Sequence, residues 1–467
     1  MKAASNNANR QPPAATPAAS NNANRQPPAT QQAANRQPPA TQQAASRQPP
    51  TTQQATSRQP KRRDDMTYIL RKKYLNKIKP FIDKPIVKVI TGMRRVGKST
   101  LLQMIQSELL TDVPQSCIIH INLESAQYLS IKNDLDLQKL ITKRSQQIEG
   151  KLYFFFDEIQ LVTHWERVIN ALRVNYDCDI YLTGSNSKLL SGELATLLAG
   201  RYVSFEVLPF TFSEFVDLYQ SLNLSIQELF QLYIKIGGMP PLHYFMGEEE
   251  PSFKYLNDIY NTVVVKDVLE YNSIRAVDVF NRILLFCLEN IGHSFSANSL
   301  RKYFVSESRS VSIDTILNYL NFCQAAYLLK KVPRYDSAGK KLLTVEEKYY
   351  VTDHGFRQAV GFSNVASIER ILENIVYIEL LSRGFQVHVG RINNQEIDFI
   401  ATKQGKTEYY QVSYLMASEE TRSREFSVYR LVKDNYPKYV LSMDTMNFSQ
   451  EGVIHKYLPD FLLEENT

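Results

Sequence analysis

Residues 92–100 read GMRRVGKST, and this stretch decides the fold of the first half of the chain. It contains the pattern G-x-x-x-x-G-K-S, in which backbone N–H groups, a lysine and a hydroxyl surround nucleotide phosphates. A β-branched run over residues 86–90 precedes it, and apolar residues at helical spacing follow over residues 99–109. The order of strand, glycine loop and helix predicts a phosphate-binding loop at a helix N-terminus, where the helix dipole favours an anion.

The residue types of this loop indicate its chemistry. Gly92 and Gly97 permit backbone angles that point successive N–H groups at an anion. Lys98 supplies a charge for the β- and γ-phosphates, and Ser99 supplies a hydroxyl for Mg²⁺. We therefore expect the chain to bind ATP together with Mg²⁺. The expected nucleotide-binding residues are Gly92, Met93, Arg94, Arg95, Val96, Gly97, Lys98, Ser99 and Thr100.

Strands and helices alternate after this loop. Alternation of this kind predicts a parallel sheet covered on both faces, the α/β fold of a P-loop NTPase. Ligands bind such sheets at the carboxyl ends of the strands. Further strands are expected at residues 117–122, 152–156, 180–183 and 202–207, with helices at 135–148, 165–174 and 188–198.

Two carboxylates follow the apolar run LYFFF at residues 152–156, an ending that resembles a Walker B element. The strand would place Asp157 and Glu158 at the carboxyl edge of the sheet, next to the phosphate loop. Asp157 would hold the Mg²⁺ shell with Ser99, and Glu158 would orient and polarise the attacking water. The alternative is a strand that leaves the sheet through polar residues without a catalytic role.

Together these motifs resemble a prokaryotic AAA+ ATPase family. The landmarks in this chain are GMRRVGKST, FFFDEIQ, LTGSNSKLL, LAGRYVSFEVLPFTFSEF and IGGMP. The resemblance extends over almost all of the chain from Met66 to Thr467. It implies an AAA+ core, a winged-helix segment and a C-terminal domain of unknown function related to restriction endonucleases. It implies no particular substrate.

The resemblance also suggests two further catalytic residues. The fourth strand ends in Thr183-Gly184-Ser185-Asn186, which is similar to the sensor position that touches the γ-phosphate or the water. Asn186 is the first candidate and Ser185 the second, unless both only cap the next helix. Arg201 stands where such modules carry an arginine finger, which reaches a neighbour's nucleotide in a homo-oligomer. A surface arginine that ends a helix is the alternative.

The first 65 residues form a repeat in which RQP occurs five times. No Val, Ile, Leu or aromatic residue appears before Tyr68, so the segment has nothing to bury and is expected to be disordered. It is either an inert tail or a basic arm that touches nucleic acid, and Met66 is a candidate for the effective start. The expected segments are this tail (1–65), an AAA+ core (66–210), a helical lid (211–277), a winged helix (278–355) and a restriction-endonuclease-like α/β domain (356–467).

Charge and cysteine usage narrow the partners and the cellular compartment that we expect for this chain. The net charge of +6 includes nine basic residues and no acid before Asp64, so the remainder of the chain carries −3 and its charge does not argue for nucleic acid. No apolar run approaches the ~20 residues that span a bilayer. We therefore expect a cytoplasmic protein without a membrane partner. The four cysteines, which have no C-x-x-C spacing and suit a reducing compartment, are Cys117, Cys178, Cys287 and Cys323.

Residues 279–351 read as three helices and a β-hairpin, the order of a winged helix. Cations on the wing suit phosphates, so DNA is one expected partner. Acidic residues nearby and the use of winged helices as lids leave an unknown protein partner equally open. The third helix would present Asp314, Thr315, Asn318 and Tyr319, and the hairpin carries Lys330, Lys331, Arg334, Lys340 and Lys341 beside Glu346 and Glu347.

The C-terminal segment departs from the nuclease pattern D…[DE]-x-K. Glu373 and Asp398 stand where carboxylates are expected, but the third element reads Gln411-Val412-Ser413. Ser413 has no charge with which to polarise a phosphate or activate water. We therefore expect a nuclease-like domain that no longer cuts.

The first hypothesis is an ATP-hydrolysing AAA+ switch whose nucleotide state moves its C-terminal domains, with DNA as the target. The alternative is a nucleotide-gated protein-interaction or regulatory module with slow turnover. An ATP-dependent nuclease is the third hypothesis.

Overall fold

The computed structural model describes residues 69–187, 198, 200–336, 341–393 and 395–464, without the side chains of 341–346. These residues belong to one unit, residues 67–467. Three predicted features lie outside the described part: the repeat tail, nearly all of the helix expected at 188–198, and the hairpin turn with the side chains of Lys340, Lys341 and Glu346.

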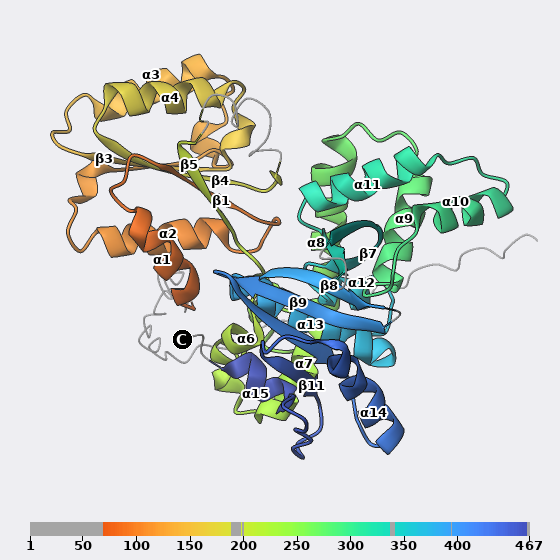
Figure 1. Cartoon of the computed structure of the whole chain (residues 1–467). Coiled ribbons are helices and arrows are strands. Elements are labelled where there is room, and N and C mark those ends of the chain that lie inside the picture. The colour runs from red at the N-terminus through yellow and green to blue at the C-terminus, as the bar shows by residue number, and fades with distance from the viewer. Residues whose placement is uncertain (1–68, 188–197, 199, 337–340, 394, 465–467) are drawn as a thin grey trace, which may run out of the picture. The chain divides into compact units, whose positions relative to one another are not determined.

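A five-stranded sheet forms the first half of the described chain (Figure 1). Its strand order is β2-β3-β4-β1-β5 and every pairing is parallel, which confirms the predicted α/β core. The predicted strands match the observed ones to within two residues at either end. The strands are β1 (Val87–Thr91), β2 (Ile118–Asn122), β3 (Leu152–Asp157), β4 (Cys178–Gly184) and β5 (Tyr202–Glu206).

Helices cover both faces of this sheet (Figure 1). Apolar side chains of α3 (Asp134–Ser145) and α4 (Trp165–Asn175) pack against one face. Those of α1 (Lys72–Ile78) and α2 (Lys98–Leu109) pack against the other. Because both faces are covered, the central strands are apolar almost throughout, as the run LYFFF illustrates.

The predicted lid is helical. It contains α6 (Phe212–Leu218), α7 (Ile226–Ile236) and α8 (Glu249–Thr262), and α8 continues as the π-helical segment η9 (Val263–Glu270). A Ser or Thr followed three residues later by Glu starts both α6 and α7, and each forms a capping box.

The IGGMP stretch, which includes Gly237 and Gly238, runs against the segment that follows β7. The N–H of Gly238 donates to Oδ2 of Asp353 at 2.8 Å, and a Cβ at Gly238 would lie 2.2 Å from the carbonyl oxygen of Phe210. Glycine is therefore required here by a close backbone approach. Burial raises the pKa of Asp353 to about 7, although N–H groups of Gly238 and Gly355 donate to it.

The next segment has the predicted three helices and hairpin. The helices are α9 (Val277–Glu289), α10 (Ala297–Ser306) and α11 (Ile313–Ala325), and the hairpin strands are β6 (Leu329–Asp336) and β7 (Lys341–Val351). The hairpin does not stand free as a wing, however. β6 pairs in parallel with β8, so the hairpin forms the edge of the C-terminal sheet and the expected boundary after residue 355 separates strands of one sheet.

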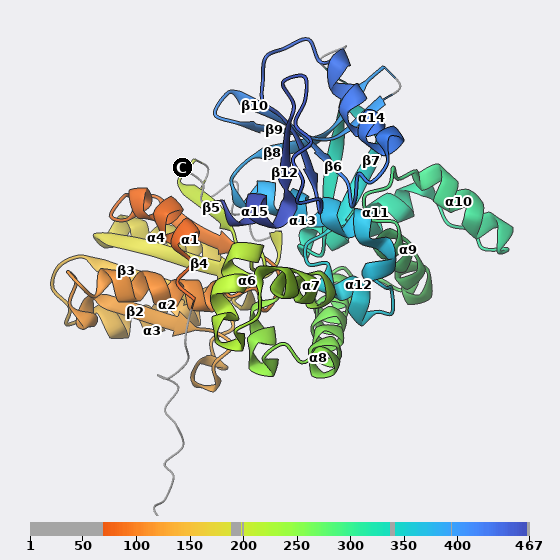
Figure 2. The same cartoon turned by 90° about the horizontal axis from the view of Figure 1, so that it is seen from below.

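This second sheet has seven strands in the order β12-β11-β10-β9-β8-β6-β7 (Figure 2). Apolar side chains of α13 form one hydrophobic cluster with strand residues of this sheet. Those of α14 and η11 form a second hydrophobic cluster with other strand residues of the same sheet. The remaining elements are α12 (Gly355–Ala359), α13 (Ile368–Ser382), β8 (Gln386–Ile392), β9 (Gln395–Lys403), β10 (Lys406–Val412), α14 (Glu419–Ser427), η11 (Val428–Leu431), β11 (Lys438–Ser442), β12 (Ile454–Tyr457) and α15 (Leu458–Leu463).

Within the described ranges, the helices are all too short or too polar to span a bilayer.

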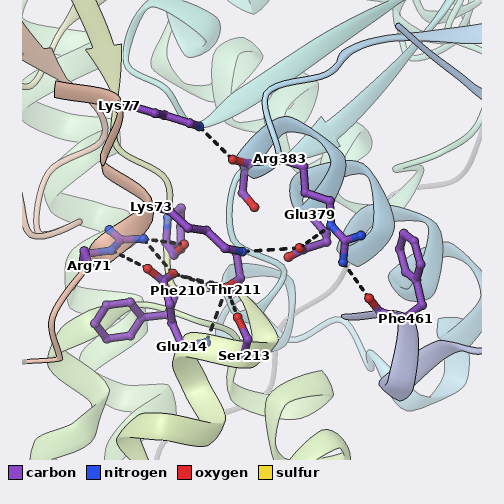
Figure 3. A network of polar contacts seen from close by, with 12 residues as sticks. Arg71, Lys73, Lys77, Phe210, Thr211, Ser213, Glu214, Glu379, Arg383 and Phe461 are labelled. Atoms are coloured by element: carbon purple, nitrogen blue, oxygen red, sulfur yellow. Dashed lines mark hydrogen bonds and ion pairs between the residues drawn. The ribbon is translucent and has the colours of Figure 1, made fainter. Parts of the chain in front are cut away.

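A network of ion pairs joins the start of α1 to the lid and to the C-terminal helices (Figure 3). Arg71 donates from Nε and Nη2 to the two carboxylate oxygens of Glu214 at 2.8 and 2.9 Å, and both side chains are at most 9% exposed. Lys73 lies 3.6 Å from Glu379, which accepts from Arg383 at 2.7 Å. The network therefore ties the start of α1 to α6 and α13 through charges, and α6 and α13 also share one apolar cluster.

We expect Glu214→Gln to lower the free energy of unfolding by about 3–5 kcal/mol at pH 7, because it leaves a buried guanidinium without a counter-charge. Burial raises the pKa of Glu214, but the charge and hydrogen bonds of Arg71 outweigh burial and hold the pKa below its ordinary value. The stabilisation by the ionised carboxylate of Glu214 is fully present above the pKa that this group has in the unfolded chain. It is lost as pH falls through the lower pKa that the group has in the folded protein. Urea denaturation from neutral to acidic pH measures both effects.

Glu228→Gln is the matched control. Glu228 occupies the same capping-box position in α7, but it is exposed and accepts hydrogen bonds from Ser225. Its replacement should cost much less stability than that of Glu214. Equal losses in the two variants would contradict a role for the charge of Arg71.

Candidate nucleotide-binding site

The phosphate loop occupies residues 92–97, between the end of β1 and the start of α2. Gly92 has φ 140° and Gly97 has φ 97°, while Arg95 adopts the left-handed region at φ 68°. A Cβ on Gly92 would lie 2.4 Å from the carbonyl oxygen of Val207, which follows β5. The loop thus turns tightly beneath the end of a neighbouring strand, and only glycine fits there.

The ammonium group of Lys98 lies inside this loop. Its Nζ donates to the carbonyl oxygens of Gly92 at 3.1 Å and Met93 at 3.2 Å, and lies 3.5 Å from Oε1 of Glu158. Lys98 is only 4% exposed. The structure therefore brings together the predicted phosphate-binding lysine and the predicted catalytic carboxylate.

A threonine that the sequence analysis did not single out contacts both Asp157 and Glu158. The hydroxyl of Thr183, on β4, donates to the carboxylate of Asp157 and accepts from the N–H of Glu158 at 2.9 Å. Glu158 itself adopts left-handed backbone angles at φ 55°, and its carboxylate accepts a hydrogen bond from Gln160. Strain of this kind at a strand end is held by surrounding contacts and is common at functional sites.

The predicted sensor residues are also at this edge. Ser185 and Asn186 are buried after β4, and Nδ2 of Asn186 donates to the carbonyl oxygen of Asp267 at 3.4 Å. Ser99 and Thr100 lie in the first turn of α2, where Ser99 is exposed. The loop, the β3 carboxylates and the β4 end therefore meet, as parallel strands require.

Arg201 lies at the other edge of the sheet. It is exposed, and its carbonyl oxygen accepts from the N–H of Val87, at the beginning of β1. The phosphate loop follows the end of β1, about 16 Å away at roughly 3.3 Å per residue. Within one chain Arg201 is not brought to the site, so its role as a finger stays a prediction that needs a second copy.

The residues at this edge fit a magnesium nucleotide. The N-terminus of α2 presents backbone N–H groups, and buried Lys98 adds a positive charge beside them. Ser99 and Asp157 offer the hard oxygen ligands that Mg²⁺ prefers. Asp157 is already held in place by Thr183, so the carboxylate needs little reorganisation to serve as a ligand.

A polar pocket of about 320 Å³ lies beside the C-terminal sheet. Glu373, Asp398, Gln411 and Ser413 all line it, so the structure brings together the residues of the nuclease-like pattern. The N–H of Val412 donates to Oδ2 of Asp398 at 2.8 Å. Burial raises the pKa of Asp398, and the neighbouring Glu373 adds to this effect.

Lys348 brings to this cluster the positive charge that Ser413 lacks, which the sequence analysis missed. Its Nζ lies 3.4 Å from Oε2 of Glu373 and 2.7 Å from Oε1 of Glu396, and the side chain is buried. No local signal could have found Lys348, because it comes from the hairpin that was expected to be a wing. In the part of the chain that the structure describes, no three His, Cys, Asp or Glu side chains are grouped so as to hold a metal ion.

The described cations of the predicted wing are paired with carboxylates. Lys330 pairs with Glu206, Lys331 pairs with Glu347, and Arg334 lies 2.8 Å from Glu396. On α11, Asp314 and Asn318 are exposed and Thr315 is half-buried, while Tyr319 packs edge-on against Phe280. Among the charges predicted to meet DNA, the three whose side chains the structure describes are therefore already balanced within the chain.

Comparison with known proteins agrees with this geometry. Residues 84–216 match the family model of an AAA domain, and residues 227–367 match a domain of unknown function. With the phosphate loop and the parallel sheet, the first match defines an AAA-type P-loop ATPase domain. The second match crosses the boundaries expected after residues 277 and 355, and the restriction-endonuclease-like character of residues 356–467 stays a prediction.

Two curated relatives extend along most of the chain. An uncharacterized protein of Haemophilus influenzae is 35% identical over 400 residues, which are 85% of this chain and 99% of that protein. An uncharacterized protein of Methanocaldococcus jannaschii is 31% identical over 381 residues, 77% of this chain and 80% of its own length. The chain belongs to the same family of AAA-domain proteins as these two relatives.

A search of solved structures matches part of the chain to the Walker-type ATPase of Pyrococcus abyssi, with a TM-score of 0.46 and 15% identity over 64% of this chain and 97% of that one. The Orc1 protein of Aeropyrum pernix, solved in complex with DNA, has a TM-score of 0.31 and 11% identity over 65% of this chain and 91% of that one.

Gly92→Ala should cost about 1–3 kcal/mol more unfolding free energy than Gly150→Ala, because only the first substitution adds a clash to the backbone strain. Gly150 has φ 95°, and nothing lies within 4 Å of a Cβ placed on it. Denaturation by urea, followed by circular dichroism, gives both values. Similar losses would mean that the turn at Gly92 is looser than the structure indicates.

Proposed function

We propose that this protein is an ATP-hydrolysing AAA+ switch. The observation that carries the proposal is the buried contact of Lys98 with the phosphate loop and Glu158, at the strand edge where Asp157 and Asn186 also lie. A buried ammonium group surrounded by carbonyl oxygens and one carboxylate is poised to exchange those partners for phosphate oxygens.

Each residue at this edge has a distinct role in the proposed reaction. Lys98 and the loop amides bind the phosphates, while Ser99 and Asp157 would hold the magnesium ion, which neutralises phosphate charge when bound. Glu158 orients and polarises the attacking water, and Asn186 contacts the γ-phosphate or that water. Arg201 would act on the nucleotide of a neighbouring copy in a homo-oligomer.

Lys98→Ala should weaken MgATP binding about 10- to 100-fold, because a charge-assisted contact is lost, and should abolish turnover. Glu158→Gln should leave binding nearly unchanged and slow hydrolysis about 10²- to 10⁴-fold, since it removes the base. Isothermal titration calorimetry measures binding, and phosphate release measures turnover.

Lys139→Ala, which removes an exposed lysine on α3, is the control and should behave as the wild type. Unchanged binding in Lys98→Ala would exclude the loop as the phosphate site. Weak binding with normal turnover in Glu158→Gln would show that another group serves as the base.

A nucleotide-gated protein-interaction module is the second candidate function, and the paired wing cations favour it. Because Lys330 and Lys331 contact Glu206 and Glu347, they offer little unbalanced charge to a DNA backbone. The first proposal keeps DNA as the target, whereas the second has a protein partner and slow turnover.

The four cysteines are free in the structure, which fits the expected reducing cytoplasm.

Binding to a fluorescent DNA duplex, measured by anisotropy at several salt concentrations, separates the two candidates. Each phosphate contact contributes a slope of about −0.9 in log affinity against log salt. We expect the double variant Lys330→Gln, Lys331→Gln to leave this slope unchanged, because both lysines are already paired. A shallower slope in the variant would show that the hairpin binds DNA. If no DNA binds at low salt, with or without ATP, the protein-interaction module is the remaining candidate.

A further inference from the structure

Asp267 reaches the phosphate loop from the lid. It lies in the π-helical segment η9, 173 residues from its partner Arg94 in the loop. The guanidinium of Arg94 donates from Nε to Oδ2 of Asp267 at 3.2 Å and from Nη2 to Oδ1 at 3.1 Å. This two-bond geometry fixes the plane of the guanidinium as well as its position.

The pairing is selective. Arg94 also donates from Nη1 to Glu124 at 3.2 Å, but the side chain of Glu124 is 54% exposed, whereas that of Asp267 is 8% exposed. An ion pair with an exposed partner contributes little, because water screens it. The contact with Asp267 is therefore the one that holds Arg94.

The same residue holds the predicted sensor. The carbonyl oxygen of Asp267 accepts from Nδ2 of Asn186 at 3.4 Å. One position of the lid thus contacts both the phosphate loop and the end of β4. A π-helical segment is rare and is frequent at functional sites, which agrees with this placement.

The electrostatics join these groups to the catalytic carboxylate. Burial raises the pKa of Asp267, Arg94 lowers it, and the negative charge of Glu158 raises it again. Burial lowers the pKa of Arg94, but its bonds to Asp267 outweigh this effect and raise the pKa above its ordinary value. Glu158, Asp267 and Arg94 therefore interact within one local field, and a change at Asp267 is felt at the hydrolysis site.

We infer that Asp267 is a positioning residue for ATP hydrolysis, which fixes Arg94 of the phosphate loop and Asn186 of β4 from the lid. The inference rests on the proposed ATPase function. It makes the lid a part of the nucleotide site within a single chain. Arg94, rather than the distant Arg201, is then the guanidinium that the lid holds in place at the phosphate loop of its own chain.

Asp267→Asn tests this role, because it removes the charge and keeps the shape and the main-chain carbonyl. We expect kcat to fall about 10- to 100-fold, as misplaced catalytic groups do, while ATP affinity measured by calorimetry changes less than about threefold. Glu270→Gln, an exposed position in the same segment, is the control and should keep both values. A merely structural role would lower the melting temperature without this division between kcat and affinity.

A double-mutant cycle identifies the partner. If Asp267 acts through Arg94, the double variant Arg94→Gln, Asp267→Asn should be no slower than the slower single variant. Should Asp267→Asn fail to fold, Arg94→Gln alone tests the contact from the loop side and should show the same fall in kcat. Additive losses, or unchanged kcat in either folded single variant, would overturn the inference.

The wild-type protein separates this inference from the function on which it rests. If the wild type hydrolyses ATP and the Asp267→Asn variant has the same kcat, only the positioning role is overturned. Absence of ATP binding and turnover in the wild type would overturn the proposed function, and the positioning role with it.

Discussion

The buried positive charge of Lys98 is the constraint on which the nucleotide site depends. A charge taken out of water is costly unless paired, and here loop carbonyls and Glu158 supply the partners. The loop can curl around the ammonium group only because Gly92 passes closely under Val207. The parallel sheet then brings the ends of β3 and β4 to the same edge, where Thr183 holds the carboxylate of Asp157 and the backbone N–H of Glu158. Loop, strands and charge are thus parts of one arrangement.

Buried charges also link the rest of the molecule. Arg71 and Glu214 join the first helix to the lid, and Asp267 joins the lid to the phosphate loop. In the C-terminal sheet Lys348 lies between Glu373 and Glu396, from a hairpin far from both in sequence. Such contacts have strict geometry and a high cost when broken, so they fix how these elements are placed against one another.

Much of this fold could be predicted from the sequence, and the reason is local. The five core strands appear as apolar runs. The glycines of the loop at residues 92–97 have a spacing that is typical of phosphate-binding loops and of few other structures. The hairpin at residues 329–351 was also predicted as a hairpin, but its partner was not. Which strand lies beside β6 depends on the edge of β8, and no periodicity within either segment records that pairing. Asp267 and Thr183 were missed because their partners, Arg94 and Asp157, lie far away in the chain.

By itself the sequence determined that this chain has an AAA-type nucleotide domain, because glycines, a lysine and strand-end carboxylates are needed at set spacings along the chain. Only the tertiary structure decided which charges meet. It paired Lys330 and Lys331 of the predicted wing with acids and placed Arg201 at the sheet edge opposite the phosphate loop. It also set Lys348 among the C-terminal carboxylates. The physical reason is that ion pairing depends on distance in space, which the order of residues does not specify for segments separated by tens or hundreds of positions.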